Sequence, residues 1–511
     1  MTMFSRRARL RSHARVLLPA VVGAVAMCGL WAAVKDGSVA AADPPKAAVA
    51  KAAAKRPAGP LTPEERAKRK AEVEATKRLA YGKQLFNHEW QPRTPGNGFG
   101  DGLGPLFNER SCAACHRLGG LGGAGPAANN VQLIVAQRLP AGDHWETTHD
   151  AQREYVLPTA TSDTFLLHRH GTTPGYDIWR RQRLSLVEGA QVDPALSPEM
   201  RILHLQRVGL ELTAVNVPVA NGLINGTQRV VVPPTLVSFV KEERNTTALF
   251  GAGLIDKVEE KTLTVIAESQ RKEVRGRVPR TGARRLGRFG WKGQNETLLE
   301  FNEGACAAEL GLETGKMRQA KAPQPTNDLA SKANTFNISR GIDITPQDIA
   351  AMSDFVASLP APIRVEPHDK SSNVLLGERK FFEIGCADCH RQDVGDIKGI
   401  YSDLLLHRVG LTGYGRSYYG TFVVDPPLEL VETGDPKRIA DADEFRTPPL
   451  WGIADSAPYL HDGRAATLHE AISLHGGQAR DASKAYAELH EWEQKQIVAF
   501  LQLLRAPPMS R

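Results

Sequence analysis

The sequence predicts a mainly α-helical protein that contains two copies of one module, with long loops between its helices. Three observations lead to this prediction. The pattern C-x-x-C-H occurs twice, at residues 112–116 and 386–390. Similar segments surround the two copies in the same order, and each half closes with an amphipathic helix before a proline. The 46 glycines and 33 prolines among 511 residues favour extensive loops, and the length exceeds one ordinary domain.

Residues 1–42 are predicted to be an export signal. An arginine-rich start precedes an apolar run at 16–34, and small residues then lead to a cleavage position after Ala42. If it is not cleaved, a run of this length could cross a bilayer and anchor the protein. Residues 43–75 are rich in alanine, lysine and proline and are predicted to be a solvated tether, helical where it meets the first domain.

The net charge of the chain comes largely from its N-terminal segment. Residues 1–42 carry six basic residues and one acid, so the net charge of +7 falls to +2 without them. A nearly neutral chain lacks the basic footprint of a nucleic-acid-binding protein. The composition therefore excludes that class of partner.

The internal repeat extends beyond the two C-x-x-C-H motifs. YGKQLF precedes the first motif and LGERKF precedes the second. Aligning Gly293 with Gly463 places Thr297 on Thr467 in the segments that follow. ITPQDIAAMSDFVASLPAP and EQKQIVAFLQLLRAPP are predicted to be the closing amphipathic helices, each stopped by proline.

These repeats predict two domains, at residues 76–362 and 370–511, joined by the linker PAPIRVEPHDK. The first domain carries an insertion at about 125–240, between its C-x-x-C-H motif and the segment RNTTALF. VQLIVAQ and QRVVVPPTLVSFV are strand-like runs, so a small β-element is expected there. The insertion is expected to form a wall of the site at the first motif.

Each C-x-x-C-H motif predicts covalent attachment of a haem c. A thioredoxin-type dithiol would require a βαβ context, and a zinc site would require further ligands at suitable spacing. In a c-type site the two thiols reach two vinyl groups of one porphyrin, and the adjacent histidine is the proximal iron ligand. The predicted residues are Cys112, Cys115 and His116 in the first copy and Cys386, Cys389 and His390 in the second.

Several segments occur in one order along the chain: GDGLGPLFNERSCAACHRLGGLGGAGP, ERNTTALFGAGLID, GRFGWKG, YSDLLLH, EFRTPPLWG, APYLHDGRAATLHEAI and LHGG. Together they resemble the di-haem oxidoreductase family of peroxidases or "thiol oxidoreductases", a branch of the superfamily of bacterial di-haem cytochrome c peroxidases and methylamine-utilisation di-haem enzymes. The resemblance covers nearly the whole mature chain. It implies two mostly α-helical cytochrome c-like domains whose haems face each other across an interface.

The resemblance implies that the C-terminal haem is low-spin and stores an electron. Counting forward from His461 reaches His475, which we predict to be the second axial ligand; a surface histidine is the alternative. A His–Fe–His site would have a lower potential than a His/Met site. His407 is a rival ligand or a propionate partner. His461 is expected to shape the interface or to bind a propionate.

In the first domain, Ala305 occupies the position equivalent to His475, so this iron lacks a repeat-encoded second ligand, as a substrate site would. The resemblance implies that Glu309 takes a proton from bound peroxide and returns it to the departing oxygen; a helix-surface glutamate is the alternative. Trp291 aligns with the aromatic residue between the haems and is predicted to relay electrons, or else it packs in the core.

Three other side chains could complete the first site. Cys306 is a lone thiol that could be buried and inert, an iron ligand, or redox-active. His168 and His170 are candidates for a sixth ligand in the resting state. Relatives often bind Ca²⁺ between their domains, but no carboxylate-rich loop in this sequence predicts a calcium site.

The sequence therefore predicts a periplasmic di-haem c oxidoreductase of the cytochrome c peroxidase type. It would reduce hydrogen peroxide at the N-terminal haem, with electrons that a small monohaem cytochrome c or cupredoxin delivers through the C-terminal haem. One alternative is an oxidoreductase that acts on a thiol or organic donor or modifies a partner protein. Another is a non-catalytic di-haem electron carrier. Membrane contact is expected only if residues 16–34 remain as an inner-membrane anchor.

Overall fold

The computed structural model describes most of the two predicted domains and little of the N-terminal segment. The predicted export signal and the tether as far as residue 61 lie outside the described residues. No helix in the part of the chain that is described combines the length and the apolar character needed to span a bilayer. The described residues are 62–92, 100–138, 164–172, 175–189, 215–218, 227–230, 237–319, 341–366, 372–410, 440 and 444–508.

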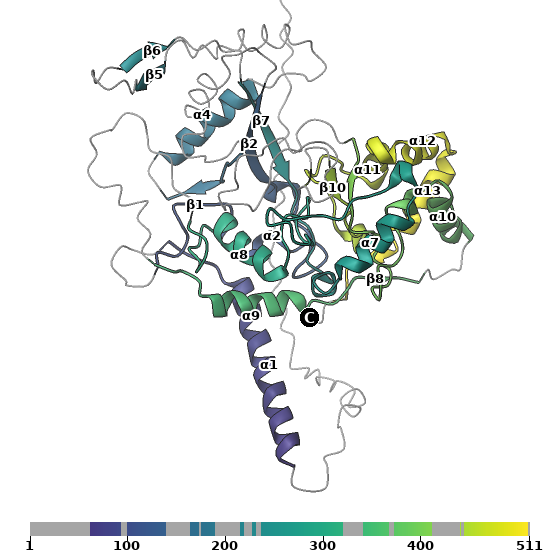
Figure 1. The fold of residues 1–511 in the computed structure, drawn as a ribbon, viewed down its shortest axis with the longest axis horizontal. Helices are drawn as coiled ribbons and strands as arrows, with labels where there is room; N and C mark the ends of the chain where they lie inside the picture. The colour runs from purple at the N-terminus through teal and green to yellow at the C-terminus, as the bar shows by residue number, and fades with distance from the viewer. Residues whose placement is uncertain are drawn as a thin grey trace, which may run out of the picture. The chain divides into compact units, whose positions relative to one another are not determined.

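The fold is mainly α-helical, as predicted, with short helices connected by long loops (Figure 1). The tether becomes helical where it meets the first domain, as expected. The first half contains α1 (Pro63–Asn87), α2 (Cys112–Cys115), α4 (Tyr176–Gly189), α6 (Ala252–Ile255), α7 (Glu260–Ser269), α8 (Leu298–Glu309) and α9 (Pro346–Ala357). The second half contains α10 (Ser372–Glu383), α11 (Leu468–Ser473), α12 (Arg480–Glu488) and α13 (Glu491–Leu501).

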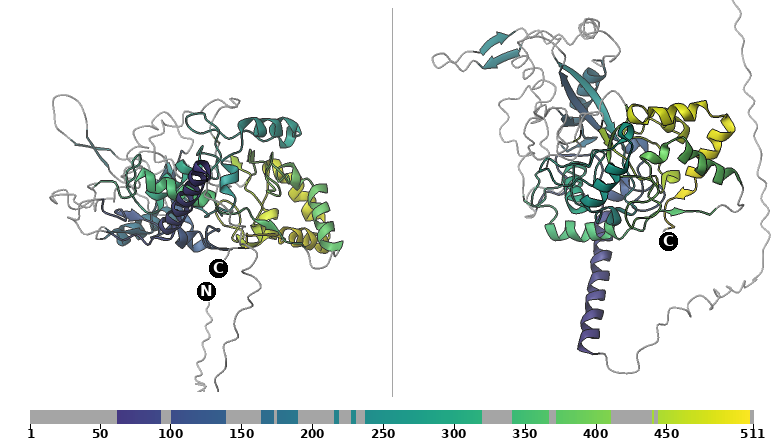
Figure 2. Two further views of the ribbon diagram at one scale, coloured as in Figure 1. Left: turned by 90° about the horizontal axis from the view of Figure 1, so that it is seen from below. Right: turned by 45° about the vertical axis from the view of Figure 1, so that its right-hand side comes forward.

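Each half of the chain packs its first long helix against its last one. α1 crosses α9 at Gly82, where a Cβ atom would lie 2.0 Å from the carbonyl oxygen of Ala351. α10 crosses α13 at Gly377, where a Cβ atom would lie 2.0 Å from the carbonyl oxygen of Gln496. Figure 1 and Figure 2 show α10 and α13 side by side. The two glycines are equivalent in YGKQLF and LGERKF, so the repeat extends to the packing of the helices.

Aromatic rings fill the space beside both crossings. Phe86 of α1 and Phe355 of α9 meet edge to face at 5.5 Å, and Phe381 of α10 and Phe500 of α13 do the same at 5.4 Å. Such contacts add about 0.5–1.5 kcal/mol to the energy of burial. Phe86 also lies 6.2 Å from the ring of His116, so this packing supports the first C-x-x-C-H motif.

Replacing Gly377 with alanine is expected to destabilise the protein by about 1–3 kcal/mol, because the new methyl group would force α10 away from α13. Helix propensity alone would stabilise the alanine variant by about 1 kcal/mol. A measured loss of stability would therefore be due to the steric clash between the two helices. Urea unfolding monitored by circular dichroism measures the change. Arg379→Ala, at an exposed position of the same helix, is the control, and a Gly377→Ala protein as stable as that control would contradict the close crossing.

The aligned segments of the two halves have the same local structure. An isolated β-bridge joins the first and last residues of 289–295, and another joins those of 459–465. The aligned glycines Gly293 and Gly463 both adopt left-handed conformations, with φ of 62° and 71°. A helix then starts in each copy, α8 in the first and α11 in the second.

The same N-cap starts both of these helices. The hydroxyl of Thr297 accepts a hydrogen bond from the N–H of Glu300 at 3.1 Å, and that of Thr467 accepts one from Glu470 at 3.1 Å. Such caps satisfy backbone donors that the first helical turn leaves free. The structure therefore agrees with the alignment of the two halves. Residues 67–511 form one compact unit by their contacts, so the boundary at 362–370 stays a prediction.

A small β-element lies in the insertion, as expected. β2 (Val131–Arg138) pairs antiparallel with both β3 (Thr164–Leu166) and β7 (Val237–Arg244). β5 (Val215–Pro218) and β6 (Thr227–Val230) form a separate hairpin-like pair. The remaining pairs are β1 (Leu106–Phe107) with β4 (His170–Gly171), β8 (Ile363–Arg364) with β11 (Leu504–Arg505), and β9 (Leu406–Arg408) with β10 (Glu444–Arg446).

Two details differ from the sequence prediction. The predicted linker contains β8, which pairs with β11, and Arg364 in β8 forms an ion pair with Glu378 at 2.6 Å. The last helix ends at Leu501, well before Pro507, because the chain must extend to form β11. The segment between the domains is therefore bound to the second domain and is not a free connection.

Candidate haem sites

The two C-x-x-C-H motifs fold into the same turn. The N–H of His116 donates to the carbonyl oxygen of Cys112 at 3.0 Å, and that of His390 donates to Cys386 at 2.9 Å. In the first copy the hydroxyl of Ser111 caps the turn by accepting the N–H of Ala114 at 3.2 Å. Each turn brings both thiols and the histidine to one short stretch of backbone, as attachment to one porphyrin requires.

Both predicted proximal histidines are oriented as metal ligands. Nδ1 of His116 lies 3.1 Å from the carbonyl oxygen of Gly123, and Nδ1 of His390 lies 3.0 Å from that of Tyr401. A carbonyl only accepts, so Nδ1 carries the proton and Nε2 would be the ligand atom, as in most metal-bound histidines. Burial lowers the pKa of each histidine to about 4, which keeps the imidazole neutral for ligation. These residues fit a haem c in each motif.

His475 faces His390 across a gap of the size that an axial pair needs. The centres of their rings are 6.5 Å apart. Two imidazoles that each bind one metal through a bond of about 2 Å would have ring centres about 6 Å apart. Nδ1 of His475 lies 2.7 Å from the carbonyl oxygen of Ala471, which again leaves Nε2 for a ligand bond. The geometry supports His475 as the second ligand of the C-terminal haem.

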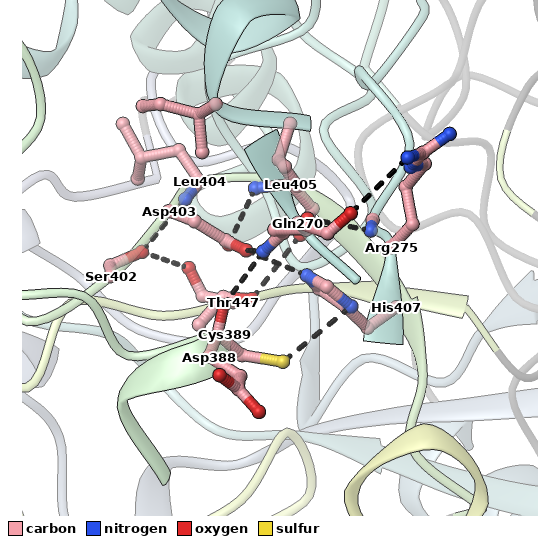
Figure 3. Close-up of polar contacts among 12 residues, drawn as sticks. Gln270, Arg275, Asp388, Cys389, Ser402, Asp403, Leu404, Leu405, His407 and Thr447 are labelled. Carbon is pink, nitrogen blue, oxygen red and sulfur yellow. Dashed lines mark hydrogen bonds and ion pairs between the residues drawn. The ribbon is translucent and has the colours of Figure 1, made fainter. Parts of the chain in front are cut away.

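His407, the rival ligand, uses both of its ring nitrogens elsewhere. Nε2 lies 2.7 Å from Oδ2 of Asp403, and Nδ1 lies 3.6 Å from Sγ of Cys389 (Figure 3). Among the described residues these three side chains form a group whose potential ligand atoms lie within 4.8 Å of one another. Its sulfur and nitrogen atoms are not the oxygen ligands that calcium prefers. The arrangement gives no support to a calcium site there or to His407 as an iron ligand.

Glu309 lies at the end of α8, close to the first motif. Its Oε2 accepts a hydrogen bond from Nδ2 of Asn108 at 2.7 Å, whereas its buried Oε1 has no partner among the described residues. Burial raises the pKa of this carboxyl group from 4.5 to about 7. Burial also raises the pKa of Cys112 and Cys115 to about 12, with the nearby charge of Glu309 as a smaller cause. Glu309 is thus partly buried, with one carboxylate oxygen inside the protein.

Two residues of the insertion, His168 and Arg169, contact the surroundings of Glu309. The backbone N–H of Arg169 donates to Oδ1 of Asn108 at 3.0 Å. Nε2 of His168 lies 2.9 Å from the carbonyl oxygen of Ala308, whereas its buried Nδ1 has no side-chain or backbone partner among the described residues. His170 is exposed and stacks on Phe107 at 5.3 Å. Sequence reasoning missed Asn108, because one asparagine in a loop carries no pattern that distinguishes it.

Cys306 is buried in α8, as expected for an inert thiol. Only 1% of its surface is exposed, and burial raises its pKa well above the ordinary value, so the reactive thiolate is disfavoured. After burial, the nearby thiol of Cys112 is the next cause of this raised pKa. Sγ of Cys112 in turn lies 3.9 Å from Sδ of Met352 in α9.

Trp291 lies between segments of the two halves. Its Nε1–H donates to the carbonyl oxygen of Asn245 at 3.2 Å, and its own carbonyl oxygen accepts the N–H of Arg446 at 2.8 Å. Its ring meets His461 edge to face at 6.4 Å. Trp291 and His461 are equivalent in the internal repeat, so equivalent turns of the two halves face each other. This position supports an inter-haem location for Trp291.

Buried donors surround His461 in this region. Its ring stacks on Phe445 at 4.2 Å, and its Nδ1 has no partner among the described residues. Arg446 is buried, and burial lowers its pKa to about 10; its Nη1 also has no partner among the described residues. A buried guanidinium nitrogen such as Nη1 of Arg446 requires an acceptor, and a haem propionate would supply a carboxylate. The expectation that His461 shapes the interface or binds a propionate agrees with these contacts.

Comparison with known proteins places the chain among di-haem enzymes. Residues 239–504, just over half of the chain, match the family model described as "Di-haem oxidoreductase, putative peroxidase". Hydrazine synthase subunit gamma of Kuenenia stuttgartiensis is 28% identical over 184 residues, which cover 33% of this chain and 52% of that protein. The methylamine utilization protein MauG of Methylorubrum extorquens is 30% identical over 130 residues, which cover 24% of this chain and 32% of that protein.

The cytochrome c551 peroxidase of Pseudomonas aeruginosa is 27% identical over 135 residues, which cover 25% of this chain and 32% of that protein. The chain thus spans about half the length, or less, of these relatives. Together with the two C-x-x-C-H turns, the family match establishes two covalently bound haem c groups as the cofactors. The chain belongs to the di-haem oxidoreductase family.

Proposed function

We propose that the protein reduces hydrogen peroxide at the haem of the first motif, with electrons that pass through the haem of the second motif. The observation that carries this proposal is the carboxyl group of Glu309, which lies beside the first motif with one buried, unpartnered oxygen. Reduction of one peroxide to two waters consumes two electrons and two protons. A peroxidase therefore needs a proton carrier at the site where the O–O bond breaks.

Glu309 is suited to move that proton. Nδ2 of Asn108 donates to Oε2, so a proton on this carboxyl group must reside on Oε1. The pKa of about 7 lets Oε1 both accept and return a proton near neutral pH. When bound, the haem iron of the first motif would supply an open coordination position and an electron. Ala305 in place of a second ligand histidine agrees with such an open position.

The second site is proposed to store the other electron. His390 and His475 would both ligate the iron of the second haem, and two histidine ligands would favour a low-spin centre. Trp291 contacts His461 and lies between the two halves, where it would carry electrons from the second site to the first. We propose periplasmic localisation, and a small monohaem cytochrome c or a cupredoxin as the electron donor.

Low-temperature electron paramagnetic resonance separates an enzyme from an electron carrier. The half-reduced protein is expected to show a high-spin ferric signal that cyanide converts to low spin, because the first iron has an open position. Peroxide is expected to bleach the same signal. The proposal would be contradicted if both irons gave low-spin signals that cyanide did not change, in the oxidised and in the half-reduced protein. That result would favour a non-catalytic electron carrier.

Steady-state assays separate peroxide reduction from oxidation of other donors. With reduced cytochrome c as the donor, peroxide turnover is expected to exceed the turnover of the same protein with small thiols or amines as donors. MauG, by its name, serves methylamine utilization, so a methylamine-related protein substrate is the test for the modifying alternative. If the protein oxidised a thiol or a protein substrate faster than reduced cytochrome c, that alternative would be favoured over peroxide reduction with a cytochrome donor.

A further inference from the structure

Asn108, the residue directly after β1, holds Glu309 by its backbone and by its side chain. The backbone N–H of Asn108 donates to the carbonyl oxygen of Glu309 at 2.7 Å, and Nδ2 of Asn108 donates to Oε2 of Glu309 at 2.7 Å. Glu309 is the last residue of α8, where backbone carbonyls lose their helical partners. Asn108 is only 3% exposed, so both bonds are shielded from solvent.

The orientation of the Asn108 amide is fixed by a partner that can only donate. β1 and β4 pair antiparallel with Phe107 opposite His170, so Arg169 is the next residue opposite Asn108. The backbone N–H of Arg169 donates to Oδ1 of Asn108 at 3.0 Å. Because a backbone N–H cannot accept, the amide atom that faces it must be the oxygen. The NH₂ group of Asn108 therefore faces Glu309.

The backbones that carry this contact approach each other closely. Gly311, just after α8, has a left-handed φ of 61°, and a Cβ atom there would lie 2.2 Å from the carbonyl oxygen of Leu106 in β1. Only glycine combines this conformation with so short an approach. The first C-x-x-C-H motif begins at Cys112, shortly after Asn108, so the contact ties Glu309 to the segment that carries the first haem.

We propose that Asn108 is a positioning residue for proton transfer, which holds Oε2 of Glu309 and leaves Oε1 as the atom that exchanges a proton with peroxide. This inference rests on the proposed function, in which Glu309 is the proton carrier. Without the amide donor, the carboxyl group could rotate about its last bond and turn Oε1 away from the reacting oxygen. Because proton transfer depends on the alignment of donor and acceptor, a carboxyl group held in one orientation transfers its proton faster.

The charged groups around Glu309 determine what its titration reports. Burial raises the pKa of Glu309 to about 7, and the hydrogen bond from Asn108 is the largest influence in the opposite direction, ahead of the charge of Arg169. Glu109 adds to the raised pKa. The two thiols of the first motif, which also lie near Glu309, become uncharged thioethers when haem is attached. Loss of the Asn108 donor is therefore expected to raise the pKa of Glu309 further.

A double-variant cycle in the holoprotein tests whether Asn108 acts through Glu309. Asn108→Leu replaces the amide with an apolar group of similar size, and kcat for peroxide is expected to fall about tenfold or more. In the Glu309→Gln background the same substitution is expected to change kcat by less than about twofold, because no proton carrier is left to position. An equal fall in both backgrounds would overturn the proposal, since Asn108 would then act independently of Glu309.

Infrared spectroscopy detects the contact without peroxide. The carboxyl C=O band that is missing in Glu309→Gln identifies Glu309, and its intensity is followed against pH. In Asn108→Leu the protonation equilibrium of Glu309 is expected to shift about tenfold toward the protonated form. The fall of kcat/KM toward low pH is then expected to begin about one pH unit higher. A shift of less than about twofold in the equilibrium would overturn the proposal.

Asn108→Asp is the second variant, in case Asn108→Leu does not fold. It keeps an acceptor for the N–H of Arg169 but places a carboxylate oxygen against Oε2 of Glu309. Two carboxyl groups at this distance share a proton, so the acidic limb is expected to move in the same direction. Asn302→Ala is the matched control and is expected to leave the Glu309 band unchanged. Asn302 is also buried in α8, but its Nδ2 donates to Oγ of Ser353 at 3.0 Å.

The two measurements separate the failure of this inference from the failure of the proposed function. If Glu309→Gln kept full peroxide turnover, the proposed function would fail, and a proton carrier for Asn108 to position would be lost with it. If Glu309→Gln lost turnover but neither Asn108 variant moved the infrared titration or the acidic limb, the proposed function would stand. Only the role of Asn108 would then be overturned.

Discussion

The Glu309→Gln variant is expected to lose peroxide turnover by about 10²- to 10⁴-fold, the usual effect of removing a general acid–base group. Glutamine keeps the size of the side chain and can still accept the hydrogen bond from Nδ2 of Asn108. It cannot take up or release a proton at the second position. Steady-state turnover with reduced cytochrome c, together with the optical and magnetic spectra of both haems, measures the effect.

The pH dependence of peroxide turnover tests the proton-transfer role of Glu309 independently. Burial raises the pKa of Glu309 to about 7, so below this pH the carboxyl group is protonated and cannot accept a proton from peroxide. The value of kcat/KM is therefore expected to fall as the pH decreases through 7 in the natural protein. In the Glu309→Gln variant this acidic limb is expected to disappear.

Glu303→Gln is the matched control for Glu309→Gln. Glu303 is also buried in α8, but its Oε1 accepts a hydrogen bond from the hydroxyl of Thr314 at 3.0 Å, and its carboxylate pairs with Lys316. Its replacement is expected to change stability more than turnover. If Glu309→Gln retained the turnover of the natural protein with unchanged spectra, Glu309 would have no place in the mechanism.

The parts of the fold that the sequence predicts well are those with a repeated pattern. Two C-x-x-C-H motifs, the aligned residues Gly293 and Gly463, and two closing amphipathic helices all have structural counterparts. Each depends on local chemistry: a turn that requires a left-handed glycine, an N-cap, or an apolar face with helical spacing. Because such features act within a few residues, a single sequence contains most of the information about them.

The contacts that the sequence could not predict join residues far apart in the chain. Asn108 meets Glu309 across 201 positions, and the pair of β8 with β11 binds the expected linker to the C-terminal end. His407 shows the limit most clearly. The sequence offers a histidine near a haem motif as a rival iron ligand, but only the structure shows that Asp403 and Cys389 contact its two ring nitrogens. The local periodicity of a sequence does not indicate which distant residue a side chain will contact.

The His475→Ala variant is expected to convert the second haem completely from low spin to high spin. The ring centres of His390 and His475 are 6.5 Å apart, close to the separation of about 6 Å expected for two imidazoles that share one metal. Removing one ring leaves a coordination position without a protein ligand, so cyanide should bind the second haem as well as the first. Electron paramagnetic resonance and cyanide titration of the oxidised protein measure the change. The second haem of this variant should also store electrons poorly, because a five-coordinate iron must reorganise its ligands when it changes oxidation state.

Chemical rescue separates ligand loss from structural damage in this variant. Free imidazole should occupy the space of the missing ring and restore the low-spin spectrum, which it could not do in a collapsed site. His469→Ala is the control, because His469 lies on α11, shortly before His475, but its Nδ1 contacts the hydroxyl of Tyr486 at 2.9 Å. A low-spin second haem in His475→Ala without added imidazole would show that another side chain is the ligand. His407 would remain a poor substitute, since both of its nitrogens are engaged and a move toward iron would leave the buried Asp403 without this hydrogen-bond partner.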